Sequence, residues 1–291
     1  MSNHYQIEAL KLLIAESVVI RSKFTAKQQR YLDDLVNQTG LIKLEKQGKG
    51  FIYRIDKESA LIAYLKQLQP VDVSELNNDL PLRSQNIALF KNSKQGVTNH
   101  SVYYLLIKAI GDDVIWFNHE HSINISQQNY IQGVSSLMIE PTDDWQTDND
   151  VLFVENMALF NRLDWLPNHF KGSIIYYAGN IPDILLSWLS YKIRAKRLLL
   201  FADYDGVGFN NFLRLYKTVS YHQSCEFYLM PNWQDKLYLF GNAAIWQNNI
   251  EKFHNAVQGL TEIGALNEEL IALIRLMQSL GKGLEQEAIW C

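Results

Sequence analysis

The chain has 291 residues with a formal net charge of −4, and 47% of its residues are hydrophobic and 20% charged. This composition excludes an intrinsically disordered chain, and no apolar run approaches the roughly 18 residues of a membrane helix. The first residues lack the basic and apolar regions of a signal peptide. The two cysteines, Cys225 and Cys291, are too few for a disulfide framework or a Cys-ligated zinc site. We therefore expect a cytoplasmic protein with no membrane contact, divided into two domains.

The sequence begins with two helical patterns followed by two short β-like runs. Apolar residues recur at helical spacing over 7–15, and Thr25 precedes a second helical pattern that ends at Gly40. The β-like runs, 41–44 and 51–55, flank a basic, glycine-containing loop and predict a hairpin. This order is typical of a winged-helix-like α+β domain. The alternative is a small helical cap with a solvated hairpin.

Positive charge is concentrated in this first domain, which we place at residues 1–70. From Arg21 to Lys57 there are nine Lys or Arg and four acids, whereas Asp112 to Glu155 contains nine acids and no Lys or Arg. The hairpin is therefore a candidate contact for a phosphate backbone, although winged helices also bind proteins. Because the whole protein is acidic, it needs a partner that loads it onto DNA. The expected DNA contacts in this domain are Lys43, Lys46, Lys49 and Arg54.

Residues 71–148 predict a linker and an intermediate α/β region. Pro70 to Pro81 is linker-like, 102–110 suits a helix, and 114–117 suits a strand. Lys94 is a further candidate for phosphate contact, with a solvated loop as the alternative. Three histidines in this region lack the spacing of a metal site, so we expect surface or core positions for His100, His119 and His121.

In the last part of the chain, apolar runs of strand length alternate with helical patterns. The run 151–154 ends in Glu155, and the run 173–177 ends in Ala-Gly-Asn. A third run, which begins at Leu198, ends in Asp203-Tyr-Asp205-Gly-Val-Gly. Each run is followed by a helix-length crossover, as parallel strands require. We therefore expect a mostly parallel sheet with these three carboxylates at the carboxyl ends of neighbouring strands.

Three interpretations compete for the aspartate pair. Asp203 and Asp205 fit a surface turn in which they cap the following helix. They also fit the Asp-x-Asp-Gly motif of haloacid-dehalogenase phosphatases, but no acidic pair ends a later strand. The third interpretation is a Toprim domain, which places a glutamate at the end of an earlier strand, as Glu155 is placed. In each case we expect Gly206 and Gly208 to allow a sharp turn into the helix.

Together, Val-Glu-Asn, the strand ending in Gly-Asn and Asp-Tyr-Asp-Gly-x-Gly resemble the Toprim domain of topoisomerase VI A subunits. They are more similar still to the JetD nuclease subunit of Wadjet plasmid-defence systems, whose relatives often share the Leu-Glu-Gln-Glu of 284–287. The chain departs from those relatives at Ala202 and Tyr204, where Gly and Leu are more common. The resemblance implies a Rossmann-like Toprim domain over 149–291.

The resemblance also implies a reaction. Relatives of this kind hydrolyse DNA with Mg²⁺ or Mn²⁺, so Asp203 and Asp205 are expected metal ligands and Glu155 a ligand or general acid–base. Glu285 and Glu287 are candidates for a further ligand, with a solvated helix face as the alternative. Topoisomerase VI A uses a tyrosine nucleophile, but Tyr31 and Tyr53 lie in no motif that aligns, so we expect attack by water. The alternative function is a catalytically silent DNA-binding or assembly subunit.

Partners follow from the same resemblance. They are double-stranded DNA, a condensin-like ATPase complex or other defence-system subunits, and a second copy of the chain in a homodimer. A cluster of basic residues precedes the strand of the aspartates and lies at its opposite end, where we expect a solvated turn or a second DNA contact. These residues are Lys192, Arg194, Lys196 and Arg197.

Overall fold

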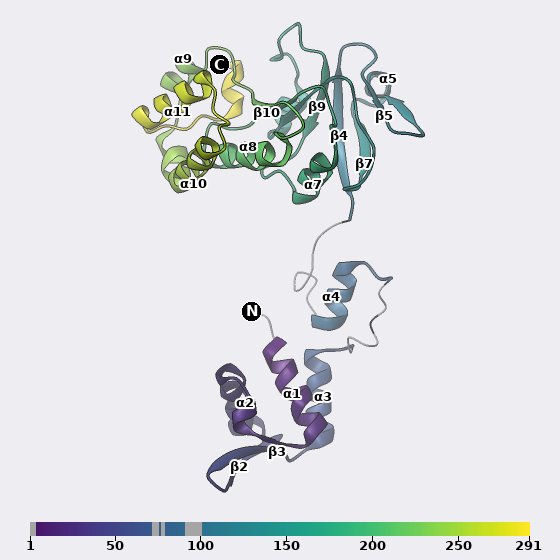
Figure 1. The fold of residues 1–291 in the computed structure, drawn as a ribbon, viewed down its shortest axis with the longest axis vertical. Helices are drawn as coiled ribbons and strands as arrows, with labels where there is room; N and C mark the ends of the chain where they lie inside the picture. The colour runs from purple at the N-terminus through teal and green to yellow at the C-terminus, as the bar shows by residue number, and fades with distance from the viewer. Residues whose placement is uncertain (1–3, 72–75, 77–78, 91–100) are drawn as a thin grey trace. The chain divides into compact units, whose positions relative to one another are not determined.

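The computed structural model describes residues 4–71, 76, 79–90 and 101–291, and the chain divides into two compact units, Met1–Asn99 and His100–Cys291 (Figure 1). The residues that the sequence assigns to an intermediate region fall on both sides of this division. Lys94 and His100, and part of the linker expected between Pro70 and Pro81, lie outside the described residues.

The first unit is a small α+β region with a three-stranded antiparallel sheet in the order β1-β3-β2. Its second helix begins at Thr25, whose side chain forms a capping box with Gln28, and ends at Gly40 in the left-handed conformation, as predicted. Leu10, Leu32 and other apolar side chains close its core. The elements are α1 (His4–Glu16), β1 (Val18–Ile20), η1 (Arg21–Lys23), α2 (Ala26–Thr39), β2 (Ile42–Gln47), β3 (Gly50–Ile55), α3 (Glu58–Leu68) and α4 (Leu82–Phe90).

The hairpin is tighter than the sequence suggested. β2 continues to Gln47 and pairs with Gly50 at the start of β3, so only Gly48 and Lys49 form the turn. Gly48 has a φ of 58°, a conformation that glycine adopts without steric cost. The expected loop over 45–50 is therefore mostly strand, which gives Lys46 a fixed place opposite Phe51.

The second unit is an α/β structure built on a six-stranded mixed sheet in the order β11-β10-β8-β9-β4-β7. Strands β11, β10, β8 and β9 run parallel to one another. Strand β4 pairs antiparallel with β9, and β7 pairs antiparallel with β4. The strands are β4 (Tyr103–Ile110), β5 (Ile115–Phe117), β6 (Ser122–Asn124), β7 (Ser135–Ile139), β8 (Asp150–Val154), β9 (Gly172–Tyr176), β10 (Leu198–Phe201) and β11 (Cys225–Phe227). The expected parallel arrangement of β8, β9 and β10 is confirmed.

One element was predicted wrongly. The stretch 102–110, expected as a helix, forms strand β4 between β9 and β7. Leu105 and Ile107 are completely buried and Leu106 between them is more exposed, which is the alternation of a strand. A short apolar run does not separate a buried strand from a buried helix, and here pairing on both sides decides. The strand expected at 114–117 is present as β5, in a separate two-stranded sheet with β6.

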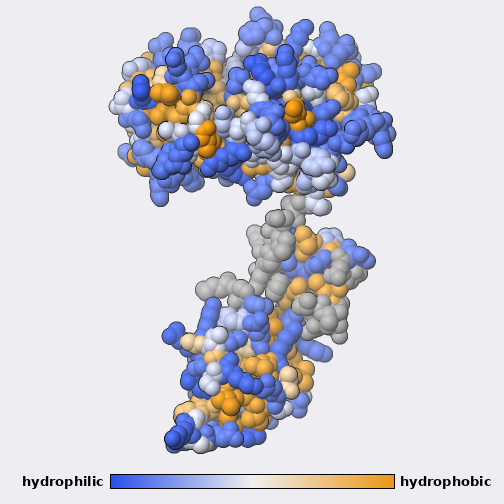
Figure 2. All heavy atoms as spheres, viewed as in Figure 1, coloured by the Kyte–Doolittle hydropathy of each residue, from blue (hydrophilic) through white to orange (hydrophobic). Residues whose placement is uncertain are grey.

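Helices α8 to α11, green to yellow in Figure 1, gather beside the β10 side of the sheet, away from β7. On the visible face of this unit hydrophilic residues predominate, and apolar residues form small scattered groups (Figure 2). Among the described residues, no helix is long and apolar enough to cross a membrane. The helices are α5 (Ile125–Gln132), α6 (Met157–Asn161), α7 (Asp183–Tyr191), α8 (Gly206–Val219), α9 (Trp233–Phe240), α10 (Ala243–Glu262), α11 (Glu268–Leu280) and the short η3 (Gln286–Trp290).

Candidate active site at the carboxyl ends of the parallel strands

The structure brings the three predicted carboxylates to neighbouring strand ends. β8 and β10 pair in parallel, with Phe201 opposite Val154 as the last pair. Glu155 follows Val154 directly, and Asp203 and Asp205 follow Phe201 after two and four residues. The charge of Asp203 acts on Glu155 strongly enough to change its pKa. The expected convergence of strand ends is therefore confirmed.

Asp205 is the most firmly held of the three. Its Oδ1 accepts hydrogen bonds of 2.8 Å from the main-chain amides of Val207 and Gly208, so it caps α8. Its Oδ2 accepts a bond of 3.1 Å from Asn249 Nδ2 of α10. The capping interpretation is thus correct for Asp205, and it coexists with a position at the site.

The glycines of the motif serve close packing rather than a turn that requires positive φ. Both lie in the first turn of α8 with ordinary helical φ values. A Cβ at Gly208 would lie 2.0 Å from the Asp203 carbonyl oxygen, and one at Gly206 would lie 2.3 Å from the Asn249 carbonyl oxygen. Only glycine lets α8 approach both the aspartate segment and α10 this closely.

Glu155 and Asp203 are partly buried and each accepts a hydrogen bond from a neutral group. Tyr177, which follows β9, donates its hydroxyl to Glu155 Oε2 at 3.1 Å. The main-chain amide of Gln286 donates to Asp203 Oδ1 at 2.8 Å. Glu287 lies beside them and accepts from Asn156 Nδ2, while Glu285 is exposed. The last segment of the chain therefore reaches the strand ends, as expected for Glu287.

Burial and mutual repulsion disfavour the charged forms of these acids. Burial, followed by the charge of Asp203, raises the pKa of Glu155 to about 7. Burial also raises the pKa of Asp203 to about 7, where the Gln286 amide opposes and the charge of Asp205 adds to the shift. The pKa of Asp205 is raised by burial, although two backbone amides and the charge of exposed Lys252 oppose this.

The donor set suits a hard divalent cation. These are oxygen ligands from three carboxylates, and none of Glu155, Asp203, Asp205 or Glu287 forms an ion pair with a described residue. Within the part of the chain that the structure describes, however, no three His, Cys, Asp or Glu side chains already stand in the arrangement of a metal site. The acids are close enough for the charges of Asp203 and Asp205 to raise the pKa of Glu155.

The hairpin residues differ in their availability. Lys43 pairs with Asp56 at 2.5 Å and Arg54 with Glu45 at 2.9 Å. Lys46 and Lys49 are exposed and form no ion pair with any residue that the structure describes. Two of the four expected DNA contacts are thus neutralised by neighbours.

The hydroxyl groups of the two tyrosines considered as nucleophiles are buried, although Tyr31 as a whole is only partly buried. Tyr53 is completely buried, its hydroxyl donates to Asp33 Oδ1 at 2.6 Å, and its pKa is raised to about 12. The Tyr31 hydroxyl oxygen is buried, and burial raises its pKa well above the ordinary value. Both phenols are held in the neutral form, which makes them poor nucleophiles.

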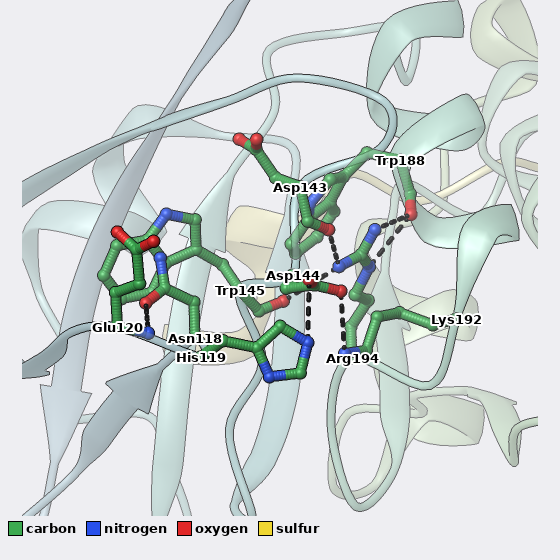
Figure 3. A network of polar contacts seen from close by, with 9 residues as sticks. All are labelled: Asn118, His119, Glu120, Asp143, Asp144, Trp145, Trp188, Lys192 and Arg194. Atoms are coloured by element: carbon green, nitrogen blue, oxygen red, sulfur yellow. Dashed lines mark hydrogen bonds and ion pairs between the residues drawn. The ribbon is translucent and has the colours of Figure 1, made fainter.

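Of the basic residues that precede β10, Lys196 is exposed, as expected for a solvated turn, whereas Arg194 is not solvated. Arg194 is completely buried, and its guanidinium donates to the carbonyl oxygens of Trp188, Trp145 and Asp143 (Figure 3). Lys192 pairs with Asp144 at 3.2 Å. Arginine has five donors in a rigid fork, and here they satisfy carbonyl groups that would otherwise be buried unpaired.

The histidine predictions are consistent with this picture. His119 pairs with the same Asp144 at 2.9 Å and is exposed, and His121 lies 3.7 Å from Glu120. Both are surface residues, as expected. At this end of the sheet Arg197 also pairs with Asp150 at 2.6 Å, so acids and bases neutralise each other.

Sequence reasoning missed several residues that hold the site. Tyr177, Asn156, Asn249 and Gln286 position the carboxylates, and Lys252 supplies the nearby positive charge. Asn156 follows Glu155 directly, and Gln286 lies between the two acids of the Leu-Glu-Gln-Glu segment. These two had a local signal, whereas the other contacts depend on chain segments distant in sequence.

Comparison of the chain with models of protein families and with curated protein sequences gives no match.

Proposed function

We propose that this protein is a metal-dependent DNA endonuclease of the Toprim type. The observation that carries the proposal is that Glu155, Asp203 and Asp205 lie at adjacent parallel strand ends, and that none of them forms an ion pair with a residue that the structure describes. Burying carboxylates that repel each other costs stability, and a purely structural site would pair them with a lysine or arginine. Perturbed carboxyl pKa values in such a cluster are typical of functional sites.

The hydrogen bonds of each carboxylate suggest its role in the proposed reaction. Asp203 and Asp205 are the expected ligands of Mg²⁺ or Mn²⁺, with Glu287 as a further ligand, because their carboxylates are fixed by main-chain or amide donors. A bound divalent cation supplies activation of the attacking water and neutralisation of the phosphate charge. Burial, followed by the charge of Asp203, raises the pKa of Glu155 to about 7, so its carboxyl group is suited to proton exchange. Tyr177 orients that carboxyl group by its hydrogen bond.

The first unit supports a role in DNA binding. Its order α1, β1, η1, α2, β2, β3 and its three-stranded antiparallel sheet support our proposal that it is a winged helix in which β2 and β3 form the wing. Lys46 and Lys49 at the tip are the contacts that can bind phosphate without giving up an ion pair. Lys43 and Arg54 would first have to leave Asp56 and Glu45. Lys94 stays a candidate outside the described residues.

The proposed setting is defence against plasmids or phage. The protein would act on double-stranded DNA as a homodimer, brought to its substrate by a condensin-like ATPase complex or another defence-system subunit. A net charge of −4 supports the need for such a loader, because the whole protein repels DNA.

A second candidate function is a catalytically silent assembly subunit that keeps the fold. One observation favours it: both oxygens of Asp205 are already occupied by hydrogen bonds from Val207, Gly208 and Asn249. An aspartate used in this way has a structural role even without a cation.

Plasmid cleavage separates the two functions. The parent protein should nick or linearise supercoiled plasmid in Mg²⁺ or Mn²⁺ and be inactive in EDTA. Asp203→Asn keeps the acceptor for the Gln286 amide, so it should fold normally and cut at least about 100-fold more slowly. Asp205→Asn should also be inactive. Equal cutting by parent and Asp203→Asn would remove these carboxylates from the chemistry and leave the assembly role.

A further inference from the structure

Gln286 is a completely buried polar residue between the two strands that carry the carboxylates. Its side-chain Nε2 donates to the carbonyl oxygen of Phe201, the last residue of β10, at 2.7 Å. Its Oε1 accepts from the main-chain amide of Asn156, just past the end of β8, at 3.3 Å. One amide side chain therefore bridges both strands at the point where their ladder stops.

The same residue also holds a carboxylate directly, since its main-chain amide donates to Asp203 Oδ1. Phe201 lies two residues before Asp203, and Asn156 follows Glu155. The hydrogen bonds of Gln286 thus fix the backbone beside Asp203 and the backbone beside Glu155. Without the bridge, the buried carbonyl oxygen of Phe201 and the partly buried amide of Asn156 would each lose this partner.

The segment that carries Gln286 is anchored independently on both sides. Tyr204 and Leu284 form a short antiparallel bridge, with hydrogen bonds of 2.8 and 3.1 Å between their main chains. Beyond Gln286, the buried Lys236 ammonium donates to three carbonyl oxygens, those of Ala288, Ile289 and Cys291. The position of Gln286 is therefore imposed by the fold.

We propose that Gln286 is a positioning residue that sets the separation of Glu155 and Asp203. This assignment rests on the proposed nuclease function and adds a residue that acts through both carboxylates without touching the substrate. Groups that orient metal ligands typically change metal affinity or activity by about 10- to 100-fold when they are removed. A residue that served only the stability of the fold would not change metal affinity or activity in this way below the melting temperature.

The chain contains a matched control at the opposite end of the same strand. Gln223 is buried, its Nε2 donates to the Ala195 carbonyl oxygen at 2.6 Å, and its Oε1 accepts from the Arg194 main-chain amide at 3.2 Å. Like Gln286 it bonds one main-chain amide and one carbonyl oxygen, but both belong to the segment that precedes β10, away from the carboxylates. Gln223→Met and Gln286→Met therefore remove equal numbers of hydrogen bonds.

The experiment compares these two variants with the parent in the full chain. Melting temperature, Mn²⁺ affinity by titration calorimetry, and kcat and KM for plasmid nicking are measured well below the melting temperatures. Both variants should melt lower by a similar amount, about 5 °C. Only Gln286→Met should lose about 10- to 100-fold in Mn²⁺ affinity and in kcat, with KM for DNA within about twofold of the parent.

Two results would overturn the assignment, and they are distinguishable. If the parent cuts DNA, Asp203→Asn does not, and both methionine variants match the parent in Mn²⁺ affinity and kcat, Gln286 is only structural. If the parent neither binds Mn²⁺ nor cuts, the nuclease function fails and the assignment falls with it. Should Gln286→Met not fold, Gln286→Asn takes its place: the shorter amide cannot reach both Phe201 and Asn156, and it should show the same loss.

Discussion

The two ends of strands β8 and β10 handle charge in opposite ways. At the amino end, Asp150 pairs with Arg197, and Arg194 is buried beneath carbonyl oxygens. At the carboxyl end, Glu155 and Asp203 are partly buried with no described basic residue in contact. In the same sheet, the charges at the amino end are therefore paired, whereas the acids at the carboxyl end form no ion pair with a described residue.

This difference separates stability from function. Paired or satisfied charges at the amino end require no ligand to explain them. At the carboxyl end, burial and the charges of neighbouring acids raise the pKa values of Glu155 and Asp203, so the fold loses stability as the pH rises through about 7. A protein keeps such a cost where a cation or a reaction compensates for it.

The largest effect on stability is expected at the amino end. Arg194→Met would leave the carbonyl groups of Trp188, Trp145 and Asp143 without their donor, so the free energy of unfolding should fall by at least about 3 kcal/mol. Denaturant unfolding measures this. Nuclease activity below the melting temperature should stay near that of the parent.

Arg214 is the control for this change. It pairs with Asp183, whose side chain is 96% exposed. Arg214→Met should therefore cost less than about 1 kcal/mol. An equal loss of unfolding free energy in the two variants would mean that the buried hydrogen bonds of Arg194 stabilise the fold no more than an exposed ion pair does.

The next effect concerns pH. Because the folded-state pKa values of Glu155 and Asp203 are raised, their favourable contribution is complete below their unfolded values near 4 and is lost as the pH rises through about 7. At about 1.4 kcal/mol per pKa unit, the metal-free protein should lose about 2 kcal/mol of unfolding free energy from each of these groups between pH 5.5 and pH 8. Asp203→Asn should flatten this dependence and melt higher than the parent at pH 8. If the unfolding free energy of parent and variant depended on pH in the same way, ionisation of Asp203 would not destabilise the folded protein.

The smallest effect is expected for DNA affinity at the hairpin, where two basic residues are exposed and two are paired with acids. Changing Lys46 and Lys49 to Gln should weaken DNA binding and lower the salt slope by about two counterions. Changing Lys43 and Arg54 to Gln should have less effect, because these side chains are paired with acids. Salt titration of DNA affinity measures both. An unchanged slope in the first variant would assign the hairpin to a protein partner.

The parts of this molecule that are encoded locally were predictable from sequence. Strand-length apolar runs ending in Glu155 and Asp203 predicted both the parallel pairing and the meeting of the acids. Thr25 and Gly40 marked the limits of α2 because capping depends on neighbouring residues.

The contacts that depend on distant segments were not predictable. β4 resembled a helix because its strand character comes from pairing with β9 and β7, residues 28 or more positions away. Arg194 had the sequence context of a surface turn, and only the fold brings the carbonyl groups of 143 and 145 around it. Gln286 meets Phe201 across 85 residues of sequence.

Titration with Mn²⁺ tests the central claim most directly, because it requires neither DNA nor a loader. The parent, Asp203→Asn and Asp150→Asn would be compared by calorimetry; Asp150 is the paired acid at the opposite end of the same strands. The parent and Asp150→Asn should bind Mn²⁺ alike, and Asp203→Asn at least about 10-fold more weakly. Absence of binding by the parent, or equal affinity in all three, would contradict a divalent-cation site at the carboxyl end.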